Sequence, residues 1–413
     1  MASPTASSGQ SRDQARSHTK AYVIAGILTA VVTVLLALLV RDTLHSPGHP
    51  LTTFNPHGTE SHRIESLAQK VFIVAGLVFV LVEGAVLFLV FRFRQRDDDP
   101  EDFEEPIQRH GHSTLEWTWT FVPLVLLLIL GVFYNLPTIF KLDNDSKNAK
   151  MTIEVTGQQW WWEFRYDVDN KQDQPDIITV GQMVIPVHTL ISLHIRSNDV
   201  IHSFWIPALN GTRDAVPGRT QDLAMEADHP GIYEGQCKEF CGLSHGYMRM
   251  QVKAVSASDF ATWKANQLKG PVEPKKGSMA ADGKTLVLQQ CVRCHQINGY
   301  GGTGKQIDTT LPNSDYNGVK QTLVSGNAPN LTHLMSRERF AGAMFPLYSS
   351  YKKGHGPETV DPEGVPDQGQ LVDWLHNPAL KKPMDPDGNR GMPNLNLTDD
   401  QILKIVSYIT TLK

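Results

Sequence analysis

Three long apolar runs in the first third of this 413-residue chain constrain its fold more than any other feature. They cover residues 22–40, 71–91 and 121–140, and each is about long enough to cross a ~30 Å hydrocarbon core as an α-helix. The residues that follow them are polar and rich in turn formers. The sequence therefore predicts a membrane anchor at residues 22–145, preceded by a tail at residues 1–21 and followed by a water-facing module.

Basic residues indicate how this anchor is oriented. They follow the second run at Arg92, Arg94 and Arg96, and they precede the first run at Arg12, Arg16 and Lys20. Because Lys and Arg are enriched on the cytoplasmic side of membrane helices, we expect a cytoplasmic tail and an outer water-facing module. A cleaved signal peptide is the alternative for the first run, but its apolar core is long. The residues after it, 41–43, offer no small-residue cleavage site, which favours a retained span.

All four cysteines fall into two short motifs, so none is left over for a disulfide. The second motif, Cys291-Val-Arg-Cys294-His295, has the C-x-x-C-H spacing at which c-type haem is attached. In such motifs the two thiols add to the haem vinyl groups and the adjacent imidazole binds the iron. The cysteines therefore predict redox cofactors. The formal net charge of −5 gives no case for binding nucleic acid.

The first motif, Cys237-Lys-Glu-Phe-Cys241, stands among other soft metal ligands. His245 and Met248 follow it closely, and His202 lies upstream. Two thiolates, two imidazoles and a thioether suit copper. A structural zinc site, or satisfied core residues, would leave the methionine at the end of this set unexplained.

The composition of residues 150–257 is typical of β-structure. Between Val187 and Ile195, apolar residues alternate with polar ones, which predicts a strand with one buried face. Pro-Gly pairs and Gly242 separate further short strands. We expect a Greek-key β-sandwich with the loop from Cys237 to Met248 at one end.

The remaining residues divide into a linker and a helical domain. Residues 258–279 are predicted as a linker, because the stretch from 265 onward is rich in Pro, Gly and Lys. In residues 280–413 a helical segment at 284–292 leads into the haem motif, and a capping box, Thr398-Asp-Asp-Gln401, opens the last helix. An apolar stripe on that helix can pack on the first one. Two terminal helices crossing beside a haem resemble the all-α class I cytochrome c arrangement.

A low-spin haem of this kind needs a sixth ligand, usually a methionine. The candidates are Met335, Met344, Met384 and Met392. Gly391-Met392-Pro393 matches the position of the sulfur ligand in the class I family, so Met392 is favoured and Met384 is the runner-up. His333 is a further candidate, but its surroundings resemble a loop that does not bind haem in fused oxidase cytochromes.

With these motifs in place, residues 60–256 resemble subunit II of the haem-copper cytochrome c oxidases, which implies that the β-sandwich is a cupredoxin domain. The resemblance implies a dinuclear copper (CuA) centre whose two ions are bridged by the thiolates of Cys237 and Cys241. It implies that one copper is completed by His202 and Met248, and the other by His245 and the backbone carbonyl of Glu239. Quinol-oxidising relatives have lost these ligands, so their presence favours cytochrome c as the electron source.

Three further stretches match the same family. Gly157-Gln-Gln-Trp160-Trp-Trp resembles the aromatic segment beside the copper, in which Trp160 would be the residue through which electrons enter. The loop at residues 214–219 resembles the one that meets subunit I near a magnesium ion, which the Glu239 side chain would also reach. Glu116 aligns with a carboxylate at the mouth of a proton channel in subunit I.

The whole chain resembles subunit II of bacterial oxidases with a fused cytochrome c domain. The implied route runs from an external donor through haem c and the dinuclear copper to subunit I, which reduces oxygen and pumps protons. The implied partners are subunit I, subunit III, membrane lipid and a donor such as a cytochrome c or a quinol:acceptor complex. The implied location is the bacterial plasma membrane, with both cofactor domains on its periplasmic face. The alternatives are the copper subunit of a nitric oxide reductase and a membrane-tethered electron carrier.

Overall fold

The computed structural model describes residues 51–93, 108–166, 177–297, 300–301, 305–306, 328–351, 364–385 and 390–413, with scattered helical residues between 26 and 38. The tail predicted at residues 1–21 and most of the span predicted at 22–40 lie outside the described residues. The chain divides into two compact units. One contains Glu65–Ile139, and the other contains Pro50–Ile64 and Phe140–Lys413.

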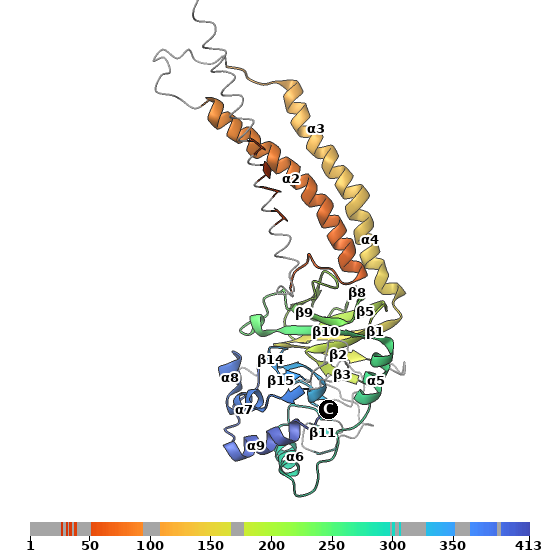
Figure 1. Ribbon diagram of the computed structural model, residues 1–413, viewed down its shortest axis with the longest axis vertical. Coiled ribbons are helices and arrows are strands. Elements are labelled where there is room, and N and C mark those ends of the chain that lie inside the picture. The colour runs from red at the N-terminus through yellow and green to blue at the C-terminus, as the bar shows by residue number, and fades with distance from the viewer. Residues whose placement is uncertain are drawn as a thin grey trace, which may run out of the picture. The chain divides into compact units, whose positions relative to one another are not determined.

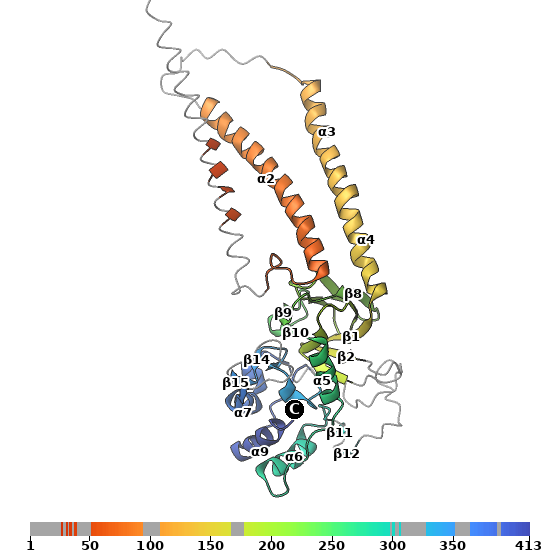
Figure 2. The same cartoon turned by 45° about the vertical axis from the view of Figure 1, so that its right-hand side comes forward.

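Two long apolar helices account for most of the described residues of the first unit, and they run alongside each other in Figures 1 and 2. Helix α2 is Thr59–Phe93; α3, Ser113–Ile129, continues through a π-helical segment, Leu130–Asn135, into α4, Leu136–Asp145. The ammonium of Lys70 lies 5.7 Å from the centre of the Tyr134 ring, which joins the two helices. Both are long and apolar enough to cross a membrane, and their apolar side chains face outward. These helices contain the spans predicted at 71–91 and 121–140.

A β-sandwich opens the second unit. One sheet has the order β3-β2-β1-β5-β8, a second has the order β4-β10-β9, and β6 pairs with β7. Pairs β1–β5 and β4–β10 are parallel, and the other pairs are antiparallel. The bounds are β1 Met151–Gln158, β2 Trp161–Tyr166, β3 Ile177–Val180, β4 Gln182–Pro186, β5 Ile191–Ser197, β6 His202–Trp205, β7 Thr212–Ala215, β8 Gln221–Met225, β9 Gly231–Gln236 and β10 Arg249–Val255. The two sheets enclose one apolar core, which includes Trp162, Phe164, Ile185 and Phe204.

The strand predicted at residues 187–195 is present only in its second half. Strand β5 begins at Ile191, and the inward residues Ile191, Leu193 and Ile195 are fully buried as the alternation predicts. The preceding residues form a turn, because His188 has a positive φ of 52° and its amide donates to the carbonyl of Ala227. The alternation of apolar and polar residues therefore extends beyond the strand, into the turn that precedes β5.

The segment predicted as a linker begins with a helix. Helix α5, Ala257–Gln267, is capped by the Ser256 side chain, which accepts a hydrogen bond from the Asp259 amide. Its Phe260 and Trp263 belong to the core of the β-sandwich. The linker interpretation of residues 258–279 is therefore wrong for its first ten residues, because two large aromatic side chains anchor them.

The carboxyl-terminal domain has four helices among its described residues: α6 Met279–Gln290, α7 Gln368–His376, α8 Pro378–Lys381 and α9 Asp399–Ile409. Short ribbons accompany them, β11 Tyr300–Gly301 with β12 Lys305–Gln306, β13 Arg339–Phe340 with β14 Phe345–Pro346, and β15 Tyr348–Tyr351 with β16 Gly364–Pro366. The predicted capping box is present at Thr398 and Gln401, and the predicted apolar stripe of α9 is buried. Helices α6 and α9 touch at Gly283, where a Cβ would collide with the Lys404 carbonyl oxygen. Only glycine permits so close a crossing.

Candidate copper and haem sites

The predicted copper ligands converge at one end of the β-sandwich. Cys237 follows β9, His202 opens β6, and Cys241, His245 and Met248 lie on the loop that leads into β10. The Cys237 and Cys241 sulfurs are 3.9 Å apart, and the Cys241 sulfur lies 3.5 Å from His245 Nδ1 and 3.7 Å from Met248 Sδ. The Cys237 sulfur lies 4.0 Å from His202 Nδ1.

The local backbone explains why these side chains meet. The Cys237 amide donates to the Met248 carbonyl at 2.9 Å, which closes the loop, and Gly242 has a φ of 106° that suits glycine alone. On the strand beside it, a Cβ at Gly157 would stand 2.9 Å from the His202 ring. The scaffold therefore holds the ligands by backbone bonds and by close packing against glycine.

The electrostatics of the pair of thiols favour a bound cation. The contact between the two sulfurs lowers the pKa of Cys237 to about 4 and raises the pKa of Cys241. The raised pKa reflects the cost of a second negative charge beside the first, and a metal cation bound by both sulfurs would offset that cost. Burial opposes protonation of His202, but its hydrogen bonds to Asp199 and Cys237 raise its pKa overall. This soft, mostly buried donor set fits copper.

Asp199 is a functional residue that the sequence did not reveal. Its carboxylate lies 2.8 Å from His202 Nε2, so that Nδ1 of the ring faces the Cys237 sulfur. Partners of this kind fix the orientation and tautomer of a metal-binding histidine. The pair Asn198-Asp199 reads in the sequence only as the end of a strand.

The residues expected to meet subunit I are placed at the surface. The backbone oxygen of Glu239 accepts from the Cys237 sulfur at 3.2 Å, whereas its side chain is exposed. In the loop at residues 214–219, Asp214, Pro217, Gly218 and Arg219 are exposed, whereas Ala215 is buried. Glu116 lies in the first turn of α3, where it accepts a hydrogen bond from the His112 amide at 2.9 Å.

The haem motif stands at the end of α6 and opens on a cavity of about 580 Å³. Cys291, Cys294 and His295 line this cavity. His295 Nδ1 lies 2.7 Å from the Pro329 carbonyl, which can only accept, so Nδ1 carries the proton and Nε2 is left as the ligand atom. Burial lowers the pKa of His295, which keeps the ring neutral. A mainly apolar cavity of this size with two thiols and an imidazole fits a haem.

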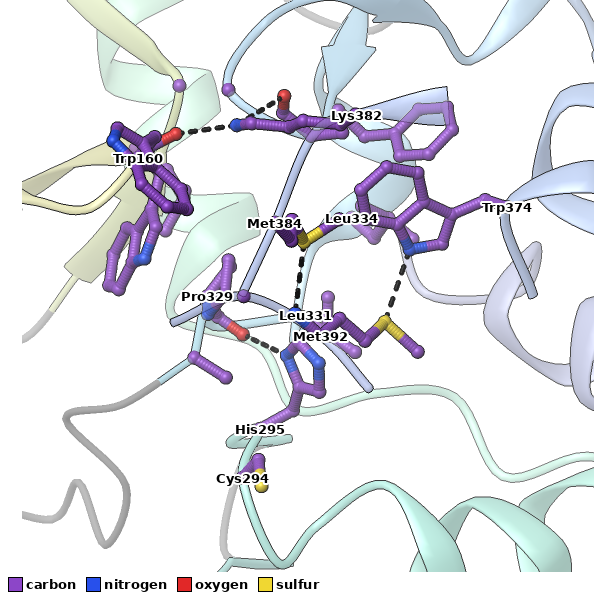
Figure 3. Close-up of a pocket in the computed structure, with 18 of the residues that line it drawn as sticks. Trp160, Cys294, His295, Pro329, Leu331, Leu334, Trp374, Lys382, Met384 and Met392 are labelled. Carbon is purple, nitrogen blue, oxygen red and sulfur yellow. Dashed lines mark hydrogen bonds between the residues drawn. The ribbon is translucent and has the colours of Figure 1, made fainter. Parts of the chain in front are cut away.

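Two of the four candidate methionines line the same cavity, Met384 and Met392 (Figure 3). The Met392 sulfur accepts from Trp374 Nε1 at 3.2 Å and packs with the cytochrome core. Met384 packs against the core of the β-sandwich, and its sulfur accepts from the Met392 amide at 3.1 Å. Met335 is buried away from the cavity lining. Both nitrogens of His333 lie within 2.9 Å of backbone carbonyls, so neither is free to bind iron.

Trp160 lies between the two sites. Only 4% of the residue is exposed, and its indole Nε1 donates to the Cys241 carbonyl at 2.9 Å. Its own carbonyl accepts from Lys382, a residue of the carboxyl-terminal domain, at 2.7 Å. Nothing in the sequence distinguishes Lys382 from a solvated lysine.

Fold and sites together define a membrane-anchored redox protein with a cupredoxin domain and a cytochrome c domain. Three family descriptions match in the same order: "Cytochrome C oxidase subunit II, transmembrane domain" at residues 55–136, "Cytochrome C oxidase subunit II, periplasmic domain" at 151–255, and "Cytochrome c" at 280–413.

Relatives point to the same family. Cytochrome c oxidase subunit 2 of Alkalihalophilus pseudofirmus is 33% identical over 287 residues, covering 68% of this chain and 80% of the relative. That of Bacillus sp. PS3 is 30% identical and covers 78% of this chain and 80% of the relative, and that of Cereibacter sphaeroides is 30% identical and covers 51% and 76%. The chain belongs to the cytochrome c oxidase subunit 2 family. It is an electron-transfer subunit of this oxidoreductase complex, a membrane protein that binds copper and haem and assembles with subunit I.

Proposed function

We propose that this subunit holds a dinuclear copper centre and a covalently attached haem c. The proposed copper ligands are His202, Cys237, Cys241, His245, Met248 and the backbone oxygen of Glu239. The convergence of both thiol sulfurs with an imidazole and a thioether, all within 4.0 Å contacts, carries this proposal. When bound, the two groups supply one-electron chemistry at fixed positions.

For the haem, we propose attachment through Cys291 and Cys294, with His295 and Met392 as axial ligands. His295 is held in the neutral, Nδ1-protonated form by the Pro329 carbonyl. Trp374 orients the Met392 sulfur, whose side chain packs with the cytochrome core. With the haem bound, these contacts would hold His295 and Met392 in place, so little rearrangement would accompany a change of charge on the iron.

The surroundings of the complex are part of the proposal. We place both domains on the periplasmic side of a bacterial plasma membrane, with a cytochrome c or another reductant as donor and with subunit III beside subunit I. Trp160 carries electrons to the copper. The exposed Glu239 side chain and the loop at residues 214–219 suit contact with subunit I and a shared magnesium ion. Glu116, exposed in this chain, is proposed to lie at a proton-channel mouth.

Metal and haem analysis of the purified complex tests these assignments. Two coppers per subunit, beyond those of subunit I, and a haem that stays with the polypeptide after denaturation are the expected result. A single copper or a zinc ion in the subunit would overturn the copper assignment. A subunit polypeptide that carries no haem after extraction with acid acetone would overturn the covalent haem assignment. The relatives favour an oxidase over a nitric oxide reductase or a free carrier, and oxygen consumption by the complex checks this.

A further inference from the structure

Lys382 is buried in an unusual way. Its residue is 4% exposed, and its Nζ donates to the carbonyl oxygens of Trp160, at 2.7 Å, and Ala341, at 3.1 Å (Figure 3). An ammonium group removed from water is costly unless its hydrogen bonds are satisfied. Burial of Lys382 is therefore favourable only where both carbonyl oxygens are in place. These hydrogen bonds join the cytochrome domain to the tryptophan beside the copper ligands.

The surrounding contacts hold the same two surfaces together. Arg390 Nε donates to the Gln159 side chain at 2.6 Å, and the Ser244 hydroxyl donates to the Pro383 carbonyl. The Arg249 amide donates to the Gly342 carbonyl at 3.0 Å. A Cβ at Gly342 would lie within 3 Å of the Lys382 ammonium and of the Trp160 and Tyr247 carbonyls. The cytochrome domain is thus packed closely on the copper end of the β-sandwich.

The contacts form a continuous connection between the two candidate sites. From Lys382 the connection passes to the Trp160 backbone, and from the Trp160 indole to the Cys241 carbonyl at 2.9 Å. On the other side, Met384 stands two residues from Lys382 and lines the cavity that contains His295. Because Trp160 is 4% exposed, a separate protein has no open face of this residue to dock against.

We propose that Lys382, assisted by Arg390, is a positioning residue for electron transfer within this chain. It fixes Trp160 against the cytochrome domain, so that Trp160 receives electrons from the haem of the same chain and is closed to a separate donor. This inference rests on the proposed function of the copper and haem sites. With both groups bound, one electron would pass from the ferrous haem, which would become ferric, to the copper pair, which would be reduced by one electron.

Lys382→Met in the complete oxidase tests the proposal, with the adjacent Lys381→Met as the matched control. Lys381 Nζ bonds to Gln370 and Asp373, at 2.9 and 3.0 Å, both inside the cytochrome domain. The measured quantity is the rate at which photoreduced haem c passes its electron to the copper. We expect a fall of about tenfold in Lys382→Met, because the loss of both hydrogen bonds frees the Trp160 backbone to move away from the cytochrome domain, and no change in Lys381→Met. The absorption spectra of both centres should stay unchanged in both variants.

A steady-state measurement separates positioning from general damage. With a separate reduced cytochrome c as substrate, Lys382→Met should lower kcat and leave KM unchanged, because the substrate meets the haem and not Trp160. A wild-type transfer rate in Lys382→Met, or a change confined to KM, would overturn the proposal. Should that variant fail to assemble, Arg390→Gln removes the neighbouring contact from an exposed side chain, and a wild-type rate there would overturn it too. If haem c does not reduce the copper in the wild-type oxidase, the proposed function itself fails.

Discussion

The copper end of the β-sandwich and the haem cavity of the cytochrome domain are built by different means. The copper ligands sit on strands and one loop, with side-chain contacts of 4.0 Å or less among them. The haem ligands come from segments more than ninety residues apart, and they surround a cavity of about 580 Å³. One site is a compact cluster of ligand side chains, whereas the other is a cavity lined by segments that lie far apart in the sequence.

This difference indicates how each site should respond to damage. In the copper site the ligand side chains contact one another in one compact cluster. The loss of one thiol should therefore abolish the site. In the haem site, attachment and axial ligation are carried by separate residues, so the loss of one axial ligand should leave the haem in place. The predictions below test this contrast, beginning with the largest expected effect.

The first prediction is that Cys237→Ser abolishes the mixed-valence copper signal and leaves the haem c spectrum intact. A hydroxyl does not replace a bridging thiolate, and the haem ligands lie in another domain. Electron paramagnetic resonance and optical spectra of the purified oxidase measure both outcomes. Leu243→Ala, an exposed position in the same loop, is the control and should keep the copper signal. An unchanged signal in Cys237→Ser would remove the copper assignment.

The second prediction is that Met392→Ala keeps covalent haem but loses the sulfur-to-iron absorption of the ferric state. Cys291, Cys294 and His295 remain, and only the sixth ligand is removed. The reduction potential should fall, because a thioether ligand raises it. Met384→Ala is the comparison variant. If the band disappears there and persists in Met392→Ala, the axial ligand is Met384, and if both variants keep it, the cytochrome assignment needs another methionine.

The third prediction concerns the ion pair that joins the two regions, Lys253 of β10 with Glu338 at 3.3 Å. Lys253 is fully buried, so Lys253→Met leaves a largely buried carboxylate without this partner and should destabilise the pair of domains by about 3 kcal/mol. The thermal unfolding midpoint of the cytochrome domain, followed by the haem absorption spectrum, measures the effect. Lys404→Met removes an exposed ion pair with Asp400 and should change this midpoint little. Equal midpoints in the two variants would show that the domains do not depend on this contact.

The fourth prediction is the smallest and concerns the cytochrome domain alone. Thr398→Ala removes the side chain that caps α9 and should cost about 1 kcal/mol of stability, visible as a lower thermal unfolding midpoint of the cytochrome domain. The copper signal should not change. Thr285→Ala, on the exposed face of α6, is the control, and it should not destabilise because alanine favours helix. Loss of copper in Thr398→Ala would contradict the separation of the two sites.

Local patterns in the sequence were enough to predict much of this architecture. The two described spans follow from apolar length, and α9 follows from its capping box and stripe. The copper candidates could be named because metal-binding side chains are chemically distinctive, and the structure brings Cys237, Cys241 and His245 together as expected.

Features that depend on distant contacts could not be predicted. Helix α5 is held by the burial of Phe260 and Trp263 against strands far from it in the sequence. The turn before β5 depends on the hydrogen bond of His188 to Ala227. Lys382 is separated from Trp160 by 222 residues, so neither composition nor spacing relates them.

The burial of Trp160 beneath the cytochrome domain has a consequence for how the oxidase responds to its medium. The effective concentration of a donor that is tethered to its acceptor is set by the geometry of the chain and not by the bulk concentration of the donor. Buried contacts are also screened by salt much less than exposed charges. We therefore expect the step within this chain to proceed at the same rate from low to high ionic strength. Reduction of its haem by a separate donor, which depends on encounter, should slow as salt is added.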